Sequence, residues 1–119
     1  MKRPGKIDYR KKPPVQVILS TFASTRQAKR MGRELVTRRL AACCNIVPGL
    51  TSFFVWKGKE EEAQETLLLV KTTAPRLSQA LDYLKRHHPY ELPELIVFSL
   101  EGAEASYLKW ILESCQRKR

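Results

Sequence analysis

The pattern of hydrophobic positions divides this chain into short apolar runs and longer stretches with a helical spacing. Runs rich in β-branched residues predict strands, and apolar residues three and four positions apart predict one face of a helix. Strands are predicted over residues 15–21, 43–56, 60–73 and 95–100, and helices over 24–40, 73–88 and 103–115. In the first helix the predicted apolar stripe consists of Ala28, Met31, Leu35, Val36 and Leu40. The run Leu95–Leu100 (LIVFSL) is predicted to be a buried strand.

The order of these elements is β-α-β-β-α-β, followed by a last helix. Two strand–helix units around a central hairpin predict an α+β fold, a ferredoxin-like sandwich with its helices on one face of the sheet. Right-handed crossovers place the first strand in the middle of that sheet, between the third and the fourth. The predicted domain covers residues 15–116, between a basic, flexible tail at residues 1–14 and a basic end at residues 117–119.

The central hairpin is longer than the rest of the predicted fold requires. Its arms span residues 43–56 and 59–73, on the order of 45 Å at ~3.3 Å per residue, whereas strands usually have about 5–6 residues. Pro48-Gly49 predicts a bulge in the first arm, and Lys57-Gly58 predicts the turn. Because two helices cannot cover the aromatic run FFVW in the outer half, the pattern predicts an oligomer joined by these hairpins. The alternative is a shorter hairpin with a disordered charged segment at residues 59–62.

The net charge of +10 lies mainly at the two ends of the chain. Residues 1–12 carry +5 and residues 117–119 carry +3, which leaves +2 for residues 13–116. Short basic ends are more often solvated than bound to a partner, so no nucleic-acid partner is expected. No apolar run reaches the roughly 20 residues of a membrane-spanning helix, so no membrane association is expected, and the basic N-terminus lacks the apolar core of a secretory signal. Three cysteines make no disulfide framework, and a cytoplasmic location is expected.

Two other functions share parts of this pattern. RNA-recognition domains have the same order of elements, but they stack bases on aromatic residues of the two central strands. The predicted central strands, VQVILST and ETLLLVKT, contain no aromatic residue. An enzyme with Cys43 as nucleophile and His87 or His88 as base needs the thiol and the imidazole within hydrogen-bond reach. A strand start and a helix end can converge in a fold of this kind, so the enzyme remains an alternative.

Several segments together resemble the CutA family of divalent-cation tolerance proteins. They are RRLAACCNIVPG, TSFFVWKGK, LLLVKTT, HHPYELPEL and YLKWI, in the family's order and within residues 15–114. The resemblance implies a ferredoxin-like subunit with a long hairpin, a homotrimer like that of the PII signalling proteins, and a role in the response to metal ions. It also implies binding of copper or another divalent metal without catalysis. The alternative is a PII-like trimer that binds a small molecule or a protein and has no physiological metal site.

The resemblance also implies a set of candidate metal ligands. Cys43 in the AAC motif and His87 before Pro89 match family positions that are linked to copper. Ser20 stands on the first strand where some bacterial members have a third ligand, a cysteine, and His88 is a further candidate. Thiolate and imidazole suit copper or zinc. The alternatives are burial of the cysteines as small apolar residues and capping of the preceding helix by the histidines.

A second candidate site is a cleft between subunits, of the kind in which PII-like trimers bind effectors. Its predicted residues are Phe54, Trp56, Lys71, Tyr90 and Glu91. Trp56, beside the hairpin turn, is expected to anchor an interface. The predicted function is that of a homotrimeric, non-enzymatic, cytoplasmic protein that binds divalent metal ions, with Cu(II) as the first candidate.

Overall fold

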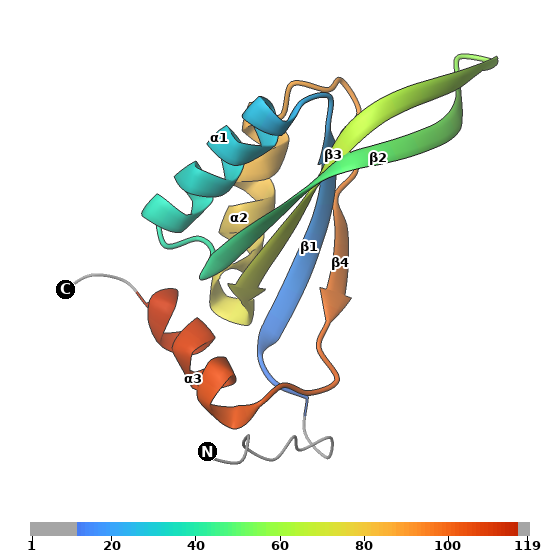
Figure 1. Cartoon of the computed structure of the whole chain (residues 1–119). Coiled ribbons are helices and arrows are strands. Elements are labelled where there is room, and N and C mark those ends of the chain that lie inside the picture. Colours follow the sequence, from blue (N-terminus) through green and yellow to red (C-terminus); the bar gives the residue numbers. More distant parts are fainter. Residues whose placement is uncertain (1–11, 117–119) are drawn as a thin grey trace.

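The computed structural model describes residues 12–116, which form strands and helices in the predicted order (Figure 1). The strands are β1 (Val15–Phe22), β2 (Cys43–Trp56), β3 (Lys59–Thr73) and β4 (Ile96–Ser99). The helices are α1 (Thr25–Thr37), α2 (Ala74–His87) and α3 (Ala105–Ser114). The predicted α+β class is confirmed. The predicted basic segments at residues 1–14 and 117–119 lie, apart from residues 12–14, outside the described residues.

The four strands form one antiparallel sheet in the order β2-β3-β1-β4. β1 pairs with β3 over its whole length and with β4 over Gln16–Leu19, so the predicted central place of the first strand is confirmed. The one aromatic residue of the two central strands is Phe22, and it is fully buried. These strands therefore carry no exposed aromatic platform of the kind on which RNA-recognition domains stack bases.

Helix α1 begins at a serine cap and ends before a residue with left-handed backbone conformation. The hydroxyl oxygen of Ser24 accepts a hydrogen bond from the backbone N–H of Gln27 at 3.2 Å, which satisfies one of the free donors of the first turn. Arg39, shortly after the helix, has a φ of +59°. The helix therefore ends at Thr37, three residues before the predicted end at Leu40.

The buried face of α1 is narrower than the predicted stripe. It consists of Ala28, Met31, Gly32 and Leu35. Gly32 lies against β2, where an added Cβ would be 3.1 Å from the Cβ of Cys44, so a larger residue would require the neighbouring side chains to shift. Val36 is 41% exposed, and its predicted place in the core is wrong. The reason is geometric, because position 36 lies about 100° around the helix from Leu35.

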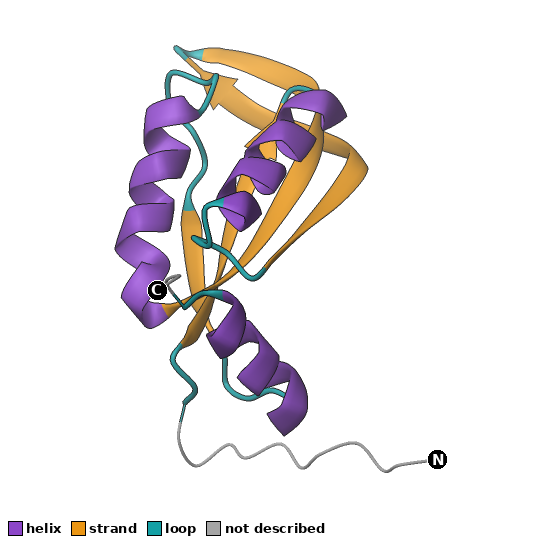
Figure 2. Cartoon of the chain, turned by 90° about the vertical axis from the view of Figure 1, so that its left-hand side faces the viewer, coloured by secondary structure: helices purple, strands orange, loops and turns teal. Residues whose placement is uncertain are grey.

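Helices α1 and α2 cover one face of the sheet, as Figure 2 shows. The core between them and the sheet consists of Ile18, Phe22, Ala28, Met31, Leu35, Ala41, Leu68, Val70, Ala80 and Leu84. Full burial of a large apolar side chain contributes about 1.5–3 kcal/mol, so this layer is the main source of stability within one subunit.

Helix α3 packs at the end of the sheet where β1 begins. A second apolar cluster joins Val15 and Ala42 to Ile111 and Cys115. Cys115 is buried in this cluster, and its burial raises the pKa of its thiol. Arg76 of α2 holds the end of α3, because its Nε donates a hydrogen bond to the carbonyl oxygen of Cys115 at 2.9 Å.

Strands β2 and β3 form the predicted long hairpin, and its outer half extends beyond the helices (Figure 1). The register shifts between Val47 and Leu50, which confirms the predicted bulge. At the tip, Lys57 and Gly58 have φ values of +51° and +78°. Both central residues of a two-residue type I′ turn need a positive φ, and Gly58 takes this conformation without strain.

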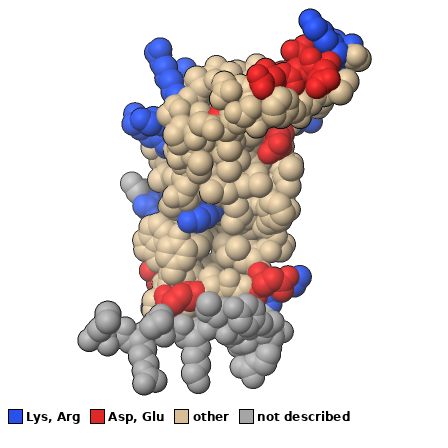
Figure 3. All heavy atoms as spheres, turned by 45° about the vertical axis from the view of Figure 1, so that its right-hand side comes forward, with Lys and Arg blue, Asp and Glu red and all other residues tan. Residues whose placement is uncertain are grey.

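The face of the sheet opposite α1 and α2, here called the open face, is apolar. Register places on it Val17, Leu19, Val47, Leu67, Leu69, Ile96 and Phe98. Figure 3, which views the molecule obliquely from this side, shows a broad surface with few charged side chains. An exposed apolar surface of this kind marks an interaction site.

Strand β4 lies exposed at the edge of this face. Ile96 and Phe98 are 45% and 52% exposed, so the prediction of a buried fourth strand is wrong for the single chain. The reason is the position of β4, which pairs with β1 alone, and neither α1 nor α2 covers the side that carries Ile96 and Phe98. A continuous apolar run predicts that both faces of a strand are buried. It does not show whether the residues that bury them belong to the same chain or to another one.

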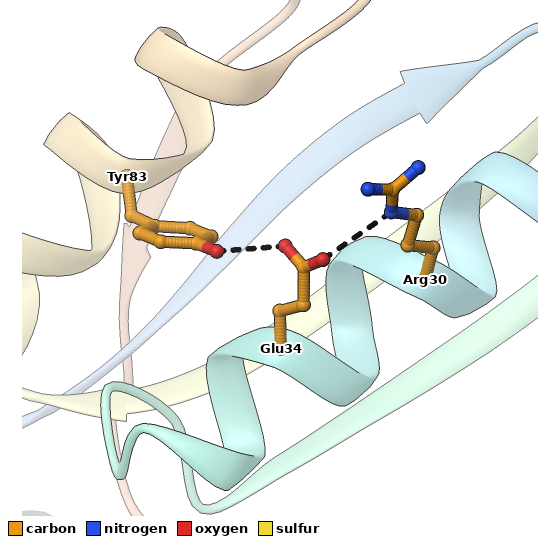
Figure 4. A network of polar contacts seen from close by, with 3 residues as sticks. All are labelled: Arg30, Glu34 and Tyr83. Carbon is orange, nitrogen blue, oxygen red and sulfur yellow. Dashed lines mark hydrogen bonds and ion pairs between the residues drawn. The ribbon is translucent and has the colours of Figure 1, made fainter.

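A polar network joins the two covering helices. Glu34 of α1 accepts a hydrogen bond from the Tyr83 hydroxyl of α2 at 2.7 Å and one from Nε of Arg30 at 3.3 Å (Figure 4). The guanidinium of Arg38 lies 4.9 Å from the centre of the Tyr83 ring. The Tyr83 hydroxyl, and to a smaller extent Arg30 and Arg38, lower the pKa of the Glu34 carboxyl.

Tyr83→Phe is expected to lower the free energy of unfolding by about 1 kcal/mol at about pH 7, because it removes one hydrogen bond to an ionised carboxylate. A lowered pKa in the folded state stabilises the protein above the pKa of 4.5 that Glu34 has when unfolded, and this stabilisation is lost as the pH falls through the folded value. The difference between the two proteins should therefore shrink at about pH 3. Urea unfolding at fixed protein concentration measures the unfolding free energy of each protein. A difference between wild type and variant that is equal at both pH values would contradict this account.

Candidate functional site

The two adjacent cysteines at the start of β2 face opposite sides of the sheet. Cys44 packs against α1, and burial raises the pKa of its thiol to about 12, so the thiol stays protonated. Cys43 lies on the open face, where its Sγ is 3.7 Å from Oδ1 of Asn45. Cys43 is therefore the thiol of this pair that a metal ion or reagent can reach, as the alternation of side chains along a strand requires.

His88 is bound into the core at the other end of the sheet. Its ring stacks on Phe22 with 4.2 Å between centroids. Nε2 lies 3.1 Å from the Ser20 hydroxyl oxygen and 3.0 Å from the carbonyl oxygen of Thr21, while Nδ1 accepts a hydrogen bond from the backbone N–H of Tyr90 at 3.1 Å. The carbonyls at the end of α2 are not its partners, so the predicted capping role is wrong for His88.

These contacts determine the tautomer of His88. A backbone N–H only donates, so Nδ1 is the acceptor and carries no proton, and Nε2–H donates toward the Thr21 carbonyl. Burial lowers the pKa of this imidazole, in agreement with a neutral ring. Both ring nitrogens are engaged, and Ser20 is fully buried beside them. The structure thus brings Ser20 and His88 together as a hydrogen-bonded pair that links β1 to the segment after α2.

His87 differs from its neighbour. It is exposed at the end of α2 and its ring lies 4.3 Å from that of Tyr83. No hydrogen bond of His87 is found among residues 12–116, so its imidazole is accessible to a ligand from outside the subunit.

Cys43 and the two histidines do not converge within one subunit. Cys43 pairs through Lys71 with Val17 of β1, whereas His88 contacts Ser20 and Thr21. Cys43 and His88 are therefore separated by three to four residues along the strands, which is about 10 Å. Across the sheet they are separated by two strand spacings, which is also about 10 Å. The predicted convergence of strand start and helix end is therefore wrong within a subunit, and no Cys–His nucleophile–base pair forms there. Within residues 12–116 no three His, Cys, Asp or Glu side chains are placed to hold a metal ion.

Four of the five residues predicted for a cleft between subunits lie around one groove of the single chain. A groove of about 880 Å³ lies between the outer hairpin and the segment after α2, and its walls include Phe54, Trp56, Tyr90 and Glu91. The Tyr90 hydroxyl donates a hydrogen bond to Oε2 of Glu65 at 2.8 Å, which fixes this wall to β3. Lys71, the fifth predicted residue, lies elsewhere, with its Nζ 3.1 Å from the Tyr107 hydroxyl oxygen of α3.

Two features of these sites were not predicted from the sequence. In the sequence, Glu65 is one of several glutamates of the hairpin, and nothing there distinguishes it. Only the fold brings the Tyr90 hydroxyl within hydrogen-bond distance of its carboxylate. The apolar open face combines residues of all four strands, and its members follow from strand register. The continuous apolar run of β3 beyond Glu65 gave a partial signal for it, since leucines occupy both faces there.

The chain matches the family of CutA1 divalent ion tolerance proteins over residues 16–114. It belongs to the CutA1 family. The resemblance identified from the five sequence segments is thereby confirmed. Within this family, the divalent-cation tolerance protein CutA of Thermus thermophilus is 42% identical over 99 residues, which cover 83% of this chain and 96% of that protein.

Solved CutA structures have the same fold as this CutA1 chain. The crystal structure of CutA from Xylella fastidiosa has a TM-score of 0.84 at 39% identity and covers 87% of this chain and 99% of that one. The protein from Archaeoglobus fulgidus, described as a periplasmic divalent cation tolerance protein CutA, has a TM-score of 0.82 at 34% identity, covering 86% of this chain and 99% of that one. The ferredoxin-like fold predicted from the pattern is thereby confirmed. Across residues 12–116, no helix combines the length and the apolar character that crossing a membrane requires.

His88→Gln is expected to flatten the pH dependence of stability between about pH 7.5 and about pH 5. His88 has a lowered pKa when folded, so its stabilising effect is full above the unfolded value of 6.5 and is lost as the pH falls toward the folded value. The wild-type protein should therefore lose more unfolding free energy across this range than the variant. His87→Gln removes a neighbouring exposed imidazole and is the matched control, whose profile should keep the wild-type shape. Identical profiles for all three proteins would contradict the assignment.

Proposed function

We propose that this CutA1 chain acts as a homotrimer in the tolerance of divalent metal ions, without catalysing a reaction. The observation that carries the proposal is the apolar open face, which the single chain leaves without cover. β2 adds an unpaired edge of 14 residues, and long exposed edges need a partner strand or another cover. Both features favour an assembly in which open faces pack together and hairpins meet neighbouring subunits.

The metal ligands of this proposal are Cys43 and His87. Both are accessible, and thiolate and imidazole suit Cu(II) or Zn(II). Because the two side chains lie at opposite ends of one subunit, a metal ion would be held between subunits, by Cys43 of one and ligands of another. Both ring nitrogens of His88 are engaged with its own subunit, so Ser20 and His88 support the fold around the site in this proposal. The proposed location is cytoplasmic, as the absence of a disulfide framework suggests.

The alternative proposal is a trimer that binds a small effector and holds no physiological metal. The groove of about 880 Å³ beside Tyr90 is the observation that favours it, since this volume falls in the range of small-molecule sites. The two proposals need the same assembly and differ in which residues bind the ligand. Their tests can therefore use the same protein.

Phe98→Glu is expected to break the assembly. Phe98 is exposed on the open face of the single chain, so a charge there costs little in a monomer but would be buried without a partner in a trimer. Sedimentation velocity at micromolar concentration should show a trimer for the wild type and a smaller species for the variant. Val36→Glu introduces the same charge at a comparably exposed apolar position of α1 and should leave the trimer intact. A stable wild-type monomer would refute the proposed assembly.

Cys43→Ala and His87→Ala are each expected to weaken the binding of Cu(II) and Zn(II) by at least about tenfold, because each removes one ligand. Calorimetric titration of the assembled protein measures this. Cys44→Ala, which removes a partly buried, protonated thiol on the helix side of the sheet, is the control and should bind metal like the wild type. Equal binding by all four proteins would exclude the proposed ligands and favour the effector-binding alternative.

A further inference from the structure

A second cavity, of about 530 Å³, lies between the first turn of α2 and the last turn of α3. The two helix ends lie near each other at the end of the sheet where β1 begins (Figures 1 and 2). The walls of this cavity, here called the α2–α3 pocket, include Pro14, Pro75, Arg76, Leu112, Cys115 and Gln116. No residue of the open face or of the outer hairpin lines it, so the contacts of the proposed trimer leave it uncovered.

Arg76 brings a nearly buried charge to this pocket. It is 9% exposed, and no carboxylate among residues 12–116 forms an ion pair with it. Its Nε donates to the carbonyl oxygen of Cys115 and its Nη1 to Oε1 of Gln79, both at 2.9 Å, whereas Nη2 has no partner within this described range. Arginine is almost never buried without an anion, because the loss of hydration destabilises an isolated charge. The pocket therefore contains a guanidinium group that lacks a counter-ion.

The neighbouring helix ends do not supply the missing negative charge. The bond to Cys115 places the guanidinium at the C-terminus of α3, where the helix dipole has a partial charge of roughly −0.5. Arg76 also belongs to the first turn of α2, where the dipole is positive and no acidic residue occurs. The two dipoles oppose each other at this residue, so a positive potential remains in the pocket.

Both basic ends of the chain are attached to the same pocket. Pro14 lines it on the side of the N-terminal residues and Gln116 on the side of the C-terminal ones. Residues 1–11 carry a net +4 and residues 117–119 carry +3, so +7 of the net +10 is joined to the fold here. The sequence alone does not show that these ends belong together, since they are separated by the whole domain. This convergence is independent of Arg76 and also favours a negatively charged ligand.

We propose that the α2–α3 pocket binds a small phosphate-bearing molecule with several negative charges. One phosphate group accepts hydrogen bonds from Nη2 of Arg76 at the start of α2, a combination of guanidinium and helix N-terminus that suits this group. The other charges face the basic ends, and the apolar walls at Pro14, Pro75 and Leu112 accommodate the body of the ligand. A volume of about 530 Å³ lies in the range of small-molecule sites.

The test is calorimetric titration of the full chain, free of metal, with sodium tripolyphosphate. An ionic strength of about 0.15 M screens weak contacts between exposed charges. Arg76→Gln removes the buried charge, and its dissociation constant is expected to rise by at least about tenfold. Arg33→Gln removes an exposed arginine of α1 outside the pocket and is the matched control, which should bind like the wild type. Inorganic phosphate should bind more weakly than tripolyphosphate.

A second pair of variants tests the basic ends and leaves Arg76 and its contacts unchanged. Arg117→Gln/Lys118→Gln removes two charges next to Gln116 and is expected to raise the dissociation constant by about threefold. Lys29→Gln/Arg33→Gln removes two charges from the exposed side of α1, which is also basic, and should have no effect. Near-UV circular dichroism shows whether Arg76→Gln keeps the packing of α3. If it does not, the C-terminal variant decides, and an unchanged affinity there would overturn the proposal.

Four results with folded proteins would overturn the proposal. They are undetectable binding of tripolyphosphate by the wild type, unchanged affinity in Arg76→Gln, equal weakening by the C-terminal and α1 double variants, and equal binding of inorganic phosphate and tripolyphosphate. All variants retain Cys43 and His87, so their metal titration separates failure of this site from failure of the proposed metal site.

Discussion

The whole structure depends on the way in which β3 is paired. Its inner half, from Thr66 to Thr73, pairs with β1, and Leu67–Lys71 of this half also pair with β2, while its outer half pairs with β2 alone. The inner half is therefore part of a sheet that α1 and α2 can cover, and the outer half forms a two-stranded ribbon. Two-stranded ribbons are marginal by themselves in water. The length of β3 thus produces both a covered sheet and an outer ribbon that no other element of the described subunit covers.

The same pairing gives the sheet two unlike apolar faces. On the helix side Leu68 and Val70 are fully buried, whereas Leu67 and Leu69 on the open face remain half-buried. A subunit that exposed a polar open face would be complete as a monomer. Leucine on both sides of a strand with helices on one side leaves an apolar face without cover in the described subunit, and the proposed assembly rests on this face.

The sequence predicted those parts of the fold that local chemistry determines. The bulge before Leu50 and the turn at Gly58 each follow from one or two residues. Relations between distant segments were harder to predict. Apolar character alone made β4 look like a buried strand, and adjacency in sequence made His87 and His88 look equivalent. Their environments differ because His88 meets Ser20, 68 residues earlier, which only the packed fold reveals.

The geometry also joins the two proposed binding chemistries through α3. Ala42 precedes Cys43 and packs in one cluster with Cys115 at the end of α3. Cys115 also lines the α2–α3 pocket beside Arg76, whose Nε holds its carbonyl oxygen. Cys43 supplies a soft ligand that suits copper or zinc, whereas the guanidinium of Arg76 suits an oxyanion, so the two sites select different ligands. An anion bound to this guanidinium is therefore placed to affect how α3 packs, and with it the end of β2 that carries Cys43.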